Sequence, residues 1–366
     1  MRVLLPLLLL VATNTASAQW RKIPVPTTAS LRGLSAAGGT VWASGTQGTV
    51  IRTADDGKTW SVMTVPGAEK LDFRGIHAFD ASTAVIMSSG QAQDGQARIY
   101  RTSDGGKSWT QVYQEKTPGV FFDAIAFWDR KHGIVLSDPV EGRFALFITG
   151  DGGVTWMPLH PAAMPPALAN EGAFAASNSC LTVQGERNVW FATGGAQVAR
   201  VFHSSDRGKS WRAAETPLHP TNASSGIFSL AFQDDKFGVA AGGDYAHPER
   251  SDLPNVLLTS DGGRTWRAGP PTDPAGLYLS SVAFFPAHPK NPARPVRVAG
   301  ITGLYDASIT EPGAWTRESS ENLNTVIYHT AGSWAVGAKG VVLRETAPAR
   351  SGDRAIARDH GDLRQK

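Results

Sequence analysis

Residues 102–109 read TSDGGKSW, and close copies of this octapeptide occur four more times in the chain. The copies are TADDGKTW (53–60), TGDGGVTW (149–156), SSDRGKSW (204–211) and TSDGGRTW (259–266). Each begins with Ser or Thr, has Asp at the third position and Gly at the fifth, and ends in Ser or Thr followed by Trp. Five copies in one chain indicate an internal structural repeat.

The octapeptide tryptophans set the period of this repeat. Trp60, Trp109, Trp156, Trp211 and Trp266 are 49, 47, 55 and 55 residues apart, and a further 49 residues lead to Trp315, where the rest of the octapeptide has decayed. Trp20 opens WRKIPVP, which echoes WSVMTVP at Trp60, so Trp20 marks the end of an octapeptide whose first half is missing. Periods of about 40–50 residues are typical of solenoids and propellers.

Three strand-like segments precede each octapeptide, and a fourth begins at its tryptophan. In the second repeat the three are FRGIHAF (73–79), TAVIMSSG (83–90) and RIYRT (98–102). They are rich in β-branched and aromatic residues and are bounded by turn-forming residues. Four-stranded units around a channel form a β-propeller. Seven such groups predict an all-β, seven-bladed propeller over residues 19–345.

The last repeat, 323–345, has three strands and no octapeptide after them. WRKIPVP at 20–26 is the one spare strand, so we expect it to become the fourth strand of the last blade. This pairing would close the ring and remove the open edges that a sheet otherwise exposes.

We expect the octapeptides to be structural hairpins between the third and fourth strands. Asp accepts hydrogen bonds from turn amides, Gly adopts positive φ, and Trp buries a large ring. Catalysis needs one convergent site rather than five equivalent turns, and one carboxylate per turn is too few for the 6–8 oxygen ligands typical of Ca²⁺. The residues given this structural role are Asp55, Gly57, Trp60, Asp104, Gly106, Trp109, Asp151, Gly153, Trp156, Asp206, Gly208, Trp211, Asp261, Gly263 and Trp266.

The two ends of the chain differ from the repeats. Residues 1–18 have a positive charge at Arg2, a short apolar run and an Ala-Ser-Ala cleavage site, which predicts a signal peptide and a secreted or periplasmic protein starting at Gln19. This run is too short to span a membrane, and no later stretch is long enough either. Residues 346–366 are polar and lack apolar periodicity, so we expect a disordered tail.

The charge and cysteine content exclude several classes of protein. Without Arg2 and the five basic and three acidic residues of the tail, 29 basic and 29 acidic residues remain, so the body is neutral and no nucleic-acid partner is expected. Cys180 is the only cysteine, which excludes an internal disulfide, and its apolar surroundings predict a buried side chain. We expect a monomer without cofactor or bound metal.

The octapeptide is the motif known as the Asp-box or BNR repeat of sialidases and other propellers. LRGLSAAGGTVWASGTQGTVIRTADDGKTW (31–60) and FRGIHAF (73–79) resemble, more specifically, the repeats of the photosystem II stability/assembly factor family, and the likeness covers most of residues 20–345. The resemblance implies a seven-bladed propeller. In photosynthetic members it implies a chaperone-like docking role on a membrane protein, so we expect a protein partner, such as a membrane-protein assembly client.

An enzyme is the alternative that the sequence leaves open. Sialidases resemble this chain in their boxes, but they carry an Arg-Ile-Pro motif, an arginine triad and a Tyr nucleophile with a Glu partner, whereas here Arg74-Gly75-Ile76 lacks the proline. A glycoside hydrolase using the channel mouth needs two carboxyl groups about 5–10 Å apart. No redox cofactor motif is present, and no catalytic motif is recognised.

A binding site is expected where the first strands of the blades line the channel. Aligning these strands on their apolar residues places one equivalent residue per blade in a ring, with Arg32, Arg74 and Asp123 on adjacent blades. One interpretation is a structural pair between Arg74 and Asp123; the other is a mouth that binds an anionic group or peptide carboxylate through arginine forks. The seven ring positions are Arg32, Arg74, Asp123, Ser179, Phe228, Ser280 and Asn324.

Long inserts between strands are the second candidate for binding, because loops on a rigid scaffold often carry function. They include SDPVEGRF (137–144), the segment 159–178 and GGDYAHPERSDLPN (242–255). The polar residues singled out in them are Asp138, Glu171, Asp244 and Tyr245.

Overall fold

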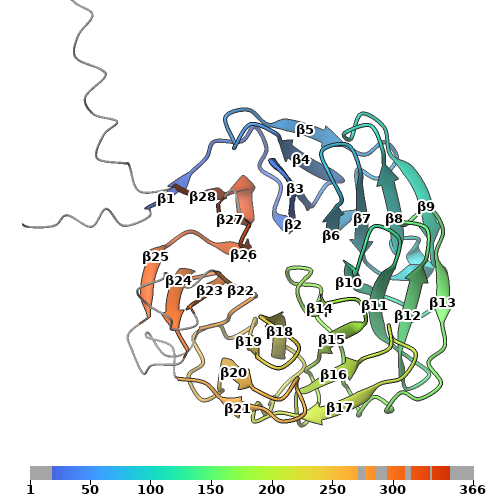
Figure 1. Ribbon diagram of the computed structural model, residues 1–366, viewed down its shortest axis with the longest axis vertical. Coiled ribbons are helices and arrows are strands. Elements are labelled where there is room, and N and C mark those ends of the chain that lie inside the picture. Colours follow the sequence, from blue (N-terminus) through green and yellow to red (C-terminus); the bar gives the residue numbers. More distant parts are fainter. Residues whose placement is uncertain (1–18, 271–276, 286–294, 310–314, 330–331, 347–366) are drawn as a thin grey trace, which may run out of the picture.

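The computed structural model describes residues 19–270, 277–285, 295–309, 315–329 and 332–346, and within these residues 28 strands form seven four-stranded sheets. The sheets are arranged around a central axis (Figure 1). The prediction of a seven-bladed β-propeller is therefore confirmed. Residues 1–18, predicted to be a signal peptide, lie outside the described residues.

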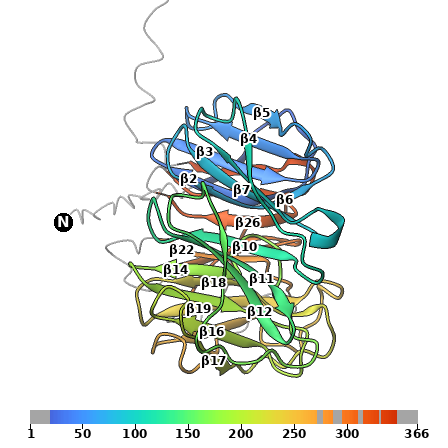
Figure 2. The same ribbon diagram turned by 90° about the vertical axis from the view of Figure 1, so that its right-hand side faces the viewer.

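The first three blades are each formed by four consecutive antiparallel strands, and the innermost is the first in sequence. Figure 2 shows β10, β11 and β12 of the third blade side by side. The strands are β2 (Leu31–Ala37), β3 (Thr40–Gly45), β4 (Thr49–Thr53) and β5 (Ser61–Thr64); β6 (Asp72–Ala78), β7 (Ala84–Ser89), β8 (Arg98–Thr102) and β9 (Thr110–Gln114); β10 (Phe122–Phe127), β11 (Gly133–Val140), β12 (Arg143–Thr149) and β13 (Met157–Leu159).

Blades four to six repeat this order. Their strands are β14 (Leu181–Gln184), β15 (Asn188–Ala192), β16 (Arg200–Ser204) and β17 (Arg212–Glu215); β18 (Ser225–Phe232), β19 (Gly238–Asp244), β20 (Val256–Thr259) and β21 (Arg267–Ala268); β22 (Ser281–Phe284), β23 (Pro295–Gly300), β24 (Gly303–Ser308) and β25 (Thr316–Ser319). Two short 3-10 helices, η1 (Ala92–Asp94) and η2 (Ala338–Gly340), lie in loops. No helix in the described part of the chain is long and apolar enough to cross a membrane.

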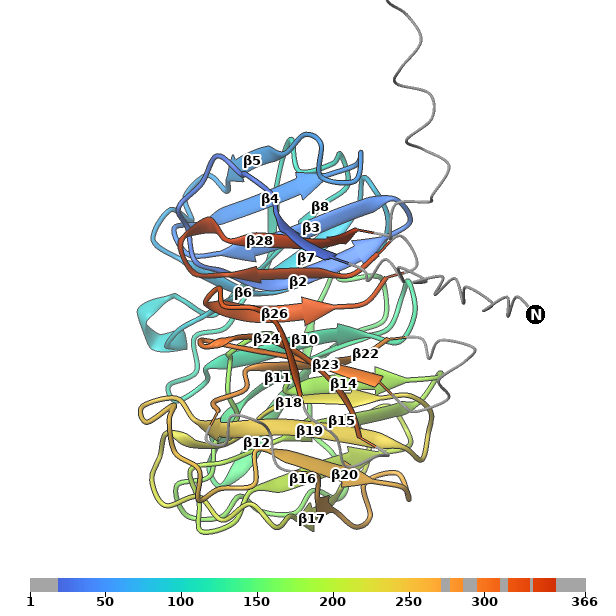
Figure 3. The same ribbon diagram turned by 90° about the vertical axis from the view of Figure 1, so that its left-hand side faces the viewer.

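The seventh blade joins the two ends of the described chain. Its strand order is β1-β28-β27-β26, in which β1 (Gln19–Lys22) is the outer strand and β26 (Leu323–Ile327), β27 (Trp334–Gly337) and β28 (Val342–Thr346) come from the other end. In Figure 3, β26 lies between β2 of the first blade and β22–β24 of the sixth. The N-terminal strand thus closes the ring as expected. Thr346 belongs to β28, where it pairs with Gln19, and not to the predicted tail, which otherwise lies outside the described residues.

The five octapeptides connect the third and fourth strands of the first five blades, and all five use the same hydrogen bonds. In the third blade Asp151 Oδ1 accepts from the amide of Thr155 at 2.9 Å, and Oδ2 accepts from the Thr155 hydroxyl at 2.6 Å. The Thr149 hydroxyl accepts from the amide of Gly153 and donates to Asp151. Gly153 has φ 81°, so the aspartate, the two hydroxyls and the glycine together satisfy a tight turn.

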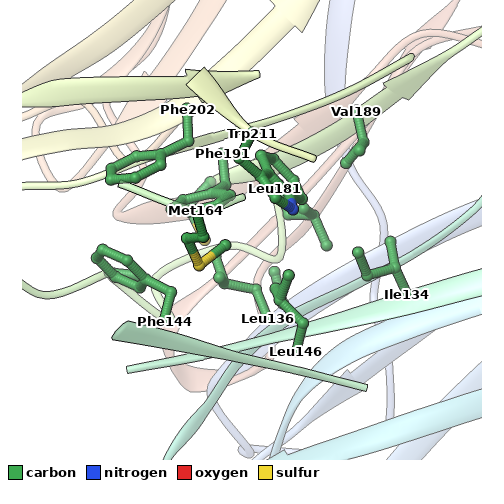
Figure 4. Packing of buried hydrophobic residues seen from close by; sticks show 13 residues of the cluster. Ile134, Leu136, Phe144, Leu146, Met164, Leu181, Val189, Phe191, Phe202 and Trp211 are labelled. Atoms are coloured by element: carbon green, nitrogen blue, oxygen red, sulfur yellow. The ribbon is translucent and has the colours of Figure 1, made fainter. Parts of the chain in front are cut away.

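Each octapeptide also packs its blade against the preceding one. A Cβ on Gly153 would meet Val85 Cγ2 of the second blade at 2.9 Å. Trp211 of the fourth blade joins a buried cluster that includes Ile134 and Leu136 of the third (Figure 4). Such apolar burial stabilises the protein by about 25 cal/mol per Å². The repeated turn therefore fixes both the hairpin and the contact between neighbouring blades.

Candidate binding site at the channel mouth

A cavity of about 610 Å³ opens where the inner strands meet at one end of the channel. Every blade except the fourth contributes a lining residue. Residues 173–176, which belong to the insert before the fourth blade, also line the cavity. Of the sequence-predicted site residues, the cavity brings together Arg32, Arg74, Asp123, Phe228, Asn324, Asp138 and Tyr245.

The ring residues reach this cavity because each lies at a β-bulge of its inner strand. On β2 the pairing with β3 passes from Leu31 to Gly33 while the partner advances by one residue, which leaves Arg32 as the extra residue. A bulge bends the strand and re-aims the extra side chain. The same register shift occurs on four other inner strands, at Arg74, Asp123, Phe228 and Asn324.

The insert before the fourth blade crosses the channel and forms the floor of the cavity. The Ser177 hydroxyl donates to the carbonyl of Ser280 in the sixth blade at 2.6 Å. The side chain of Asn178 bonds both the amide and the carbonyl of Ile125 in the third blade. Arg74 Nη1 donates to the carbonyl of Ala175 at 3.0 Å. The insert is therefore held by hydrogen bonds to the second, third and sixth blades.

Two arginines share one carboxylate on the side of the first two blades. Arg74 Nε donates to Asp72 Oδ2 at 2.7 Å, and Arg32 Nε lies 3.8 Å from the same oxygen. Burial, and next the charge of Arg74, lower the pKa of Arg32, while Asp72 opposes this effect. One carboxylate neutralises only one of two guanidinium charges, so this side of the mouth carries net positive charge.

The sequence did not predict Asp72. It is Asp72, and not Asp123, that forms the ion pair with Arg74. Among the described residues no ion pair joins Arg74 to Asp123. Asp72 begins β6 two residues before Arg74, so a search for carboxylates two positions from an arginine of an inner strand would have found it. The competing partner is simply closer along the same strand.

Two carboxyl groups occupy the neighbouring third blade. Asp123 is 1% exposed, and neither of its carboxyl oxygens has a hydrogen-bond partner among the described residues. Burial, and then the charge of Asp138, raise the pKa of Asp123 well above its usual range, against the effect of Arg74. Asp138 is half-buried; its Oδ1 accepts from the amide of Ala173 at 2.9 Å, and burial raises its pKa to about 6. A buried carboxyl group without partners is costly, so it needs an explanation.

Aromatic side chains form another part of the wall of the mouth. The ring centroids of Phe174 and Phe228 are 4.2 Å apart in a stacked arrangement, and Tyr278 meets Phe228 edge-on at 4.9 Å. Tyr245 lies 6.1 Å from Phe228 and is 53% exposed. The wall presents an apolar surface beside the charged groups of the first three blades.

Two of the predicted ring serines are structural. Ser179 exchanges hydrogen bonds with the hydroxyls of Ser177 and Ser229, and Ser280 donates to the carbonyl of Asn324 at 2.8 Å. Neither serine lines the cavity. Asn324 does line it, although its amide also donates to the carbonyl of Leu31 at 2.8 Å and so joins the last blade to the first.

Two of the predicted loop carboxylates also lie away from the cavity and are fully bonded. Glu171 is buried and forms an ion pair with Arg200. Asp244 is buried and accepts hydrogen bonds from Ser224 and Asn222. Although its burial acts to raise the pKa of Asp244, these bonds bring the pKa below its usual range. Within the described ranges no three His, Cys, Asp or Glu side chains are placed to hold a metal ion.

A second cavity of about 570 Å³ lies away from the axis, along β12 and β13. Two of its charged side chains have local partners: Arg143 Nη1 donates to the carbonyl of Met164 at 2.6 Å, and Glu115 accepts from the Tyr113 hydroxyl at 2.7 Å. Because the mouth instead combines a surplus positive charge with an unpartnered carboxyl group, we take the mouth as the candidate site.

The comparisons with known proteins support the fold. The sequence model of the DUF6242 beta propeller domain matches residues 7–237. Among solved structures, YCF48 bound to a D1 peptide is 19% identical, with a TM-score of 0.59 over 90% of this chain and 97% of that chain. YCF48 from Cyanidioschyzon merolae is 17% identical, with a TM-score of 0.62 over 90% and 99%.

A computationally designed protein, Ika8, is also similar, at 11% identity and a TM-score of 0.52 over 88% of this chain and 98% of that chain. No curated protein matches the sequence. The resemblance to photosystem II assembly factors is confirmed, because YCF48 is such a factor. At these identities the likeness concerns the fold alone.

Proposed function

We propose that this chain, which belongs to the DUF6242 beta propeller family, binds a protein segment at the mouth of its channel through a carboxylate of that segment. The observation that carries the proposal is the shared carboxylate: within the described ranges Asp72 is the one carboxylate paired with Arg32 and Arg74, so one guanidinium charge is left for a ligand. Arginine binds carboxylates with fork geometry, which favours a terminal or side-chain carboxylate.

The size of the cavity and its aromatic wall also support a peptide ligand. About 610 Å³ is within the range of cavities that enclose small ligands, and a segment of a few residues fits such a volume at least in part. Exposed Tyr245 stands at the mouth, and tyrosine is enriched where proteins bind one another. The similar YCF48 propeller is bound to a D1 peptide, and by analogy we propose an assembly-factor-like role toward a membrane-protein client.

Binding of acetyl-pentaalanine, with its free carboxyl terminus, and of the corresponding carboxamide tests this function. We expect the acid to bind the wild-type protein and the amide to bind at least about 10-fold more weakly. The double variant Arg32→Glu/Arg74→Glu should lose the difference and keep its circular dichroism spectrum. Arg187→Glu, at an exposed arginine outside the mouth, is the matched control. Equal binding of acid and amide by the wild-type protein contradicts the proposal.

We further propose that the protein acts outside the cytoplasm, because residues 1–18 have the composition of a cleavable signal. Expression of the full chain followed by mass spectrometry of the exported protein tests this. The expected mature protein begins at Gln19. A product that keeps residues 1–18 and stays in the cytoplasmic fraction contradicts the proposal.

Glycoside hydrolysis is the second candidate, favoured by the two carboxyl groups in one cavity. A hydrolase needs both groups to reach one glycosidic bond between two sugar rings, whereas Asp123, at 1% exposed, has room for no more than a small group. A sialidase tyrosine also requires a glutamate partner, and no glutamate is among the described residues that line the cavity. A panel of aryl glycosides decides between the two candidates: turnover that Asp138→Asn abolishes would establish the enzyme, and no turnover leaves binding.

A further inference from the structure

The carboxyl groups of the third blade are the feature of the mouth that carboxylate binding does not use. Asp123 lines the cavity, and its two buried oxygens have no hydrogen-bond partner in the part of the chain that the structure describes. Asp138 stands on the next strand of the same sheet, half-buried at the cavity surface. Among the described residues its Oδ2 receives no hydrogen bond, while Oδ1 is held by the amide of Ala173.

We infer that Asp138 and Asp123 form a binding site for a primary ammonium group, and that in the bound protein segment this group is a lysine side chain. The inference rests on the proposed function for the identity of the ligand as a protein segment. It adds a second recognition element to the mouth: a cation site on the third blade beside the anion site on the first two.

The chemistry of the site favours a cationic donor. An ammonium group has three N–H donors and no acceptor, and it would supply the hydrogen bonds that the two carboxyl groups lack. The groups packed around Asp123 from other elements are Arg74 of β6, Asp138 of β11 and the buried thiol of Cys180 before β14. Among these groups Asp138 is the carboxylate at the cavity surface, so a cation is complementary to it.

The shape of the site favours lysine over arginine. Asp123 is almost inaccessible, so a planar guanidinium has little room to approach it, whereas an ammonium on a thin methylene stem is compact. Phe121 and Phe174 line the same cavity; Asp138 donates its amide to the carbonyl of Phe121 at 3.2 Å, and Phe174 follows Ala173. These rings offer an apolar surface for the stem and an aromatic face for the cation.

Two small probes separate the cation site from the anion site. n-Hexylamine and hexanoate have similar stems and opposite charges, and ligand-observed NMR measures their Kd values. We expect Asp138→Asn to weaken hexylamine binding at least about 10-fold and leave hexanoate binding within about 2-fold. Arg32→Gln/Arg74→Gln should have the opposite effect. Asp94→Asn, at an exposed carboxylate on η1, is the control that should change neither.

Failure of either proposal is visible separately in this design. Equal binding of hexylamine by the wild-type protein and Asp138→Asn, or no binding up to about 10 mM, overturns the ammonium site whatever hexanoate does. If the wild-type protein binds hexylamine but not hexanoate, the proposed function fails and the ammonium site stands. Raising the pH from 5 to 7 should tighten hexylamine binding, because the pKa of Asp138 is about 6 and the ionised carboxylate is required.

Peptides identify the source of the ammonium group. Acetylated hexaalanine peptides with one lysine at successive positions are compared with the same peptides acetylated on the lysine, and with unmodified hexaalanine amide, which offers only its free amino terminus. We expect one lysine position to bind at least about 10-fold more tightly than its acetylated form, and Asp138→Asn to abolish the difference. Preference for the free amino terminus over every lysine peptide overturns the lysine assignment.

Discussion

The aspartates of the octapeptide turns and those of the channel mouth are the same residue type in opposite environments. Asp104 accepts bonds from a hydroxyl and an amide of Ser108 and from Thr102, and these bonds lower its pKa to about 2. Asp123 and Asp138 have pKa values raised by burial. A carboxylate whose bonds are complete belongs to the scaffold. Asp123, buried without a hydrogen-bond partner among the described residues, belongs instead to the site proposed above.

The scaffold depends first on closure of the ring. Deleting residues 19–26 removes β1 and leaves β28 as an open edge. It also removes Trp20, whose ring lies 5.1 Å from the Arg297 guanidinium of the sixth blade. We expect the melting temperature to fall by about 10 °C or more, the largest effect in this series. Differential scanning calorimetry measures it, and an unchanged melting temperature would refute closure by β1.

A buried, fully bonded carboxylate should be costly to neutralise. Glu171→Gln leaves the Arg200 guanidinium without its counter-charge, so we expect the free energy of unfolding to fall by about 3–5 kcal/mol in denaturant titrations. Glu141→Gln, at an exposed glutamate, should change it by less than about 0.5 kcal/mol. Similar effects of the two substitutions would mean that the buried pair does not stabilise the fold.

The turn itself is tested by two glycines of one octapeptide. Gly153→Ala forces a side chain into positive φ and against Val85, so we expect a loss of about 1–3 kcal/mol in unfolding free energy. At Gly150 a Cβ would meet nothing within 4 Å, and the equivalent residue of the first octapeptide is Ala54, so Gly150→Ala should be nearly neutral. Equal losses at the two positions would contradict a specific structural role for the glycine at the fifth position of the octapeptide.

Substitution of an aspartate of the mouth should stabilise the protein, in contrast to the two substitutions above. The reason is that burial of its ionised carboxylate costs free energy in the folded state. The pKa of Asp138 is about 6 in the folded state and about 4 in the unfolded state, so the folded protein binds more protons between these values and loses stability as the pH rises. Asp138→Asn should therefore gain about 1–2 kcal/mol at pH 7, reduced for partial exposure, and nothing at pH 3. Urea titrations at both pH values measure this, with Asp94→Asn unchanged at each. A loss at pH 7 would show that Asp138 is a scaffold residue.

The smallest effect is expected at a single turn aspartate. Hydrogen bonds from Thr265 and Thr259 outweigh the opposing effect of burial and lower the pKa of Asp261 to about 2. Its contribution is present above the unfolded pKa of about 4 and is lost as the pH falls through 2. Asp261→Asn should lower the unfolding free energy by about 0.5–1.5 kcal/mol at pH 7, the range for hydrogen bonds at an exposed site. A stabilising effect at pH 7 would reverse the comparison with Asp138.

The candidate site could be predicted from the sequence only in part. Alignment of the repeats found Arg32, Arg74 and Asp123 because equivalent positions of a propeller converge on its axis. It missed Asp72 because the alignment considered one position per blade. For the same reason, one of its two interpretations paired Arg74 with Asp123, whereas Arg74 pairs with Asp72. It also counted Ser179 and Ser280 as site residues. Their hydroxyls instead form hydrogen bonds within the protein, that of Ser179 with Ser177 of the insert and that of Ser280 with Asn324.

The sequence by itself determined the seven blades, the turns between their outer strands and the strand that closes the ring. These features follow from local rules: positive φ at glycine, a short-range bond between aspartate and hydroxyl, and alternation along a strand. Only the tertiary structure decided that the insert is bonded across the channel, that two arginines share Asp72 and that Asp123 has no hydrogen-bond partner among the described residues. Those properties arise where residues far apart in the sequence meet at the axis, because burial and charge there depend on all neighbours at once.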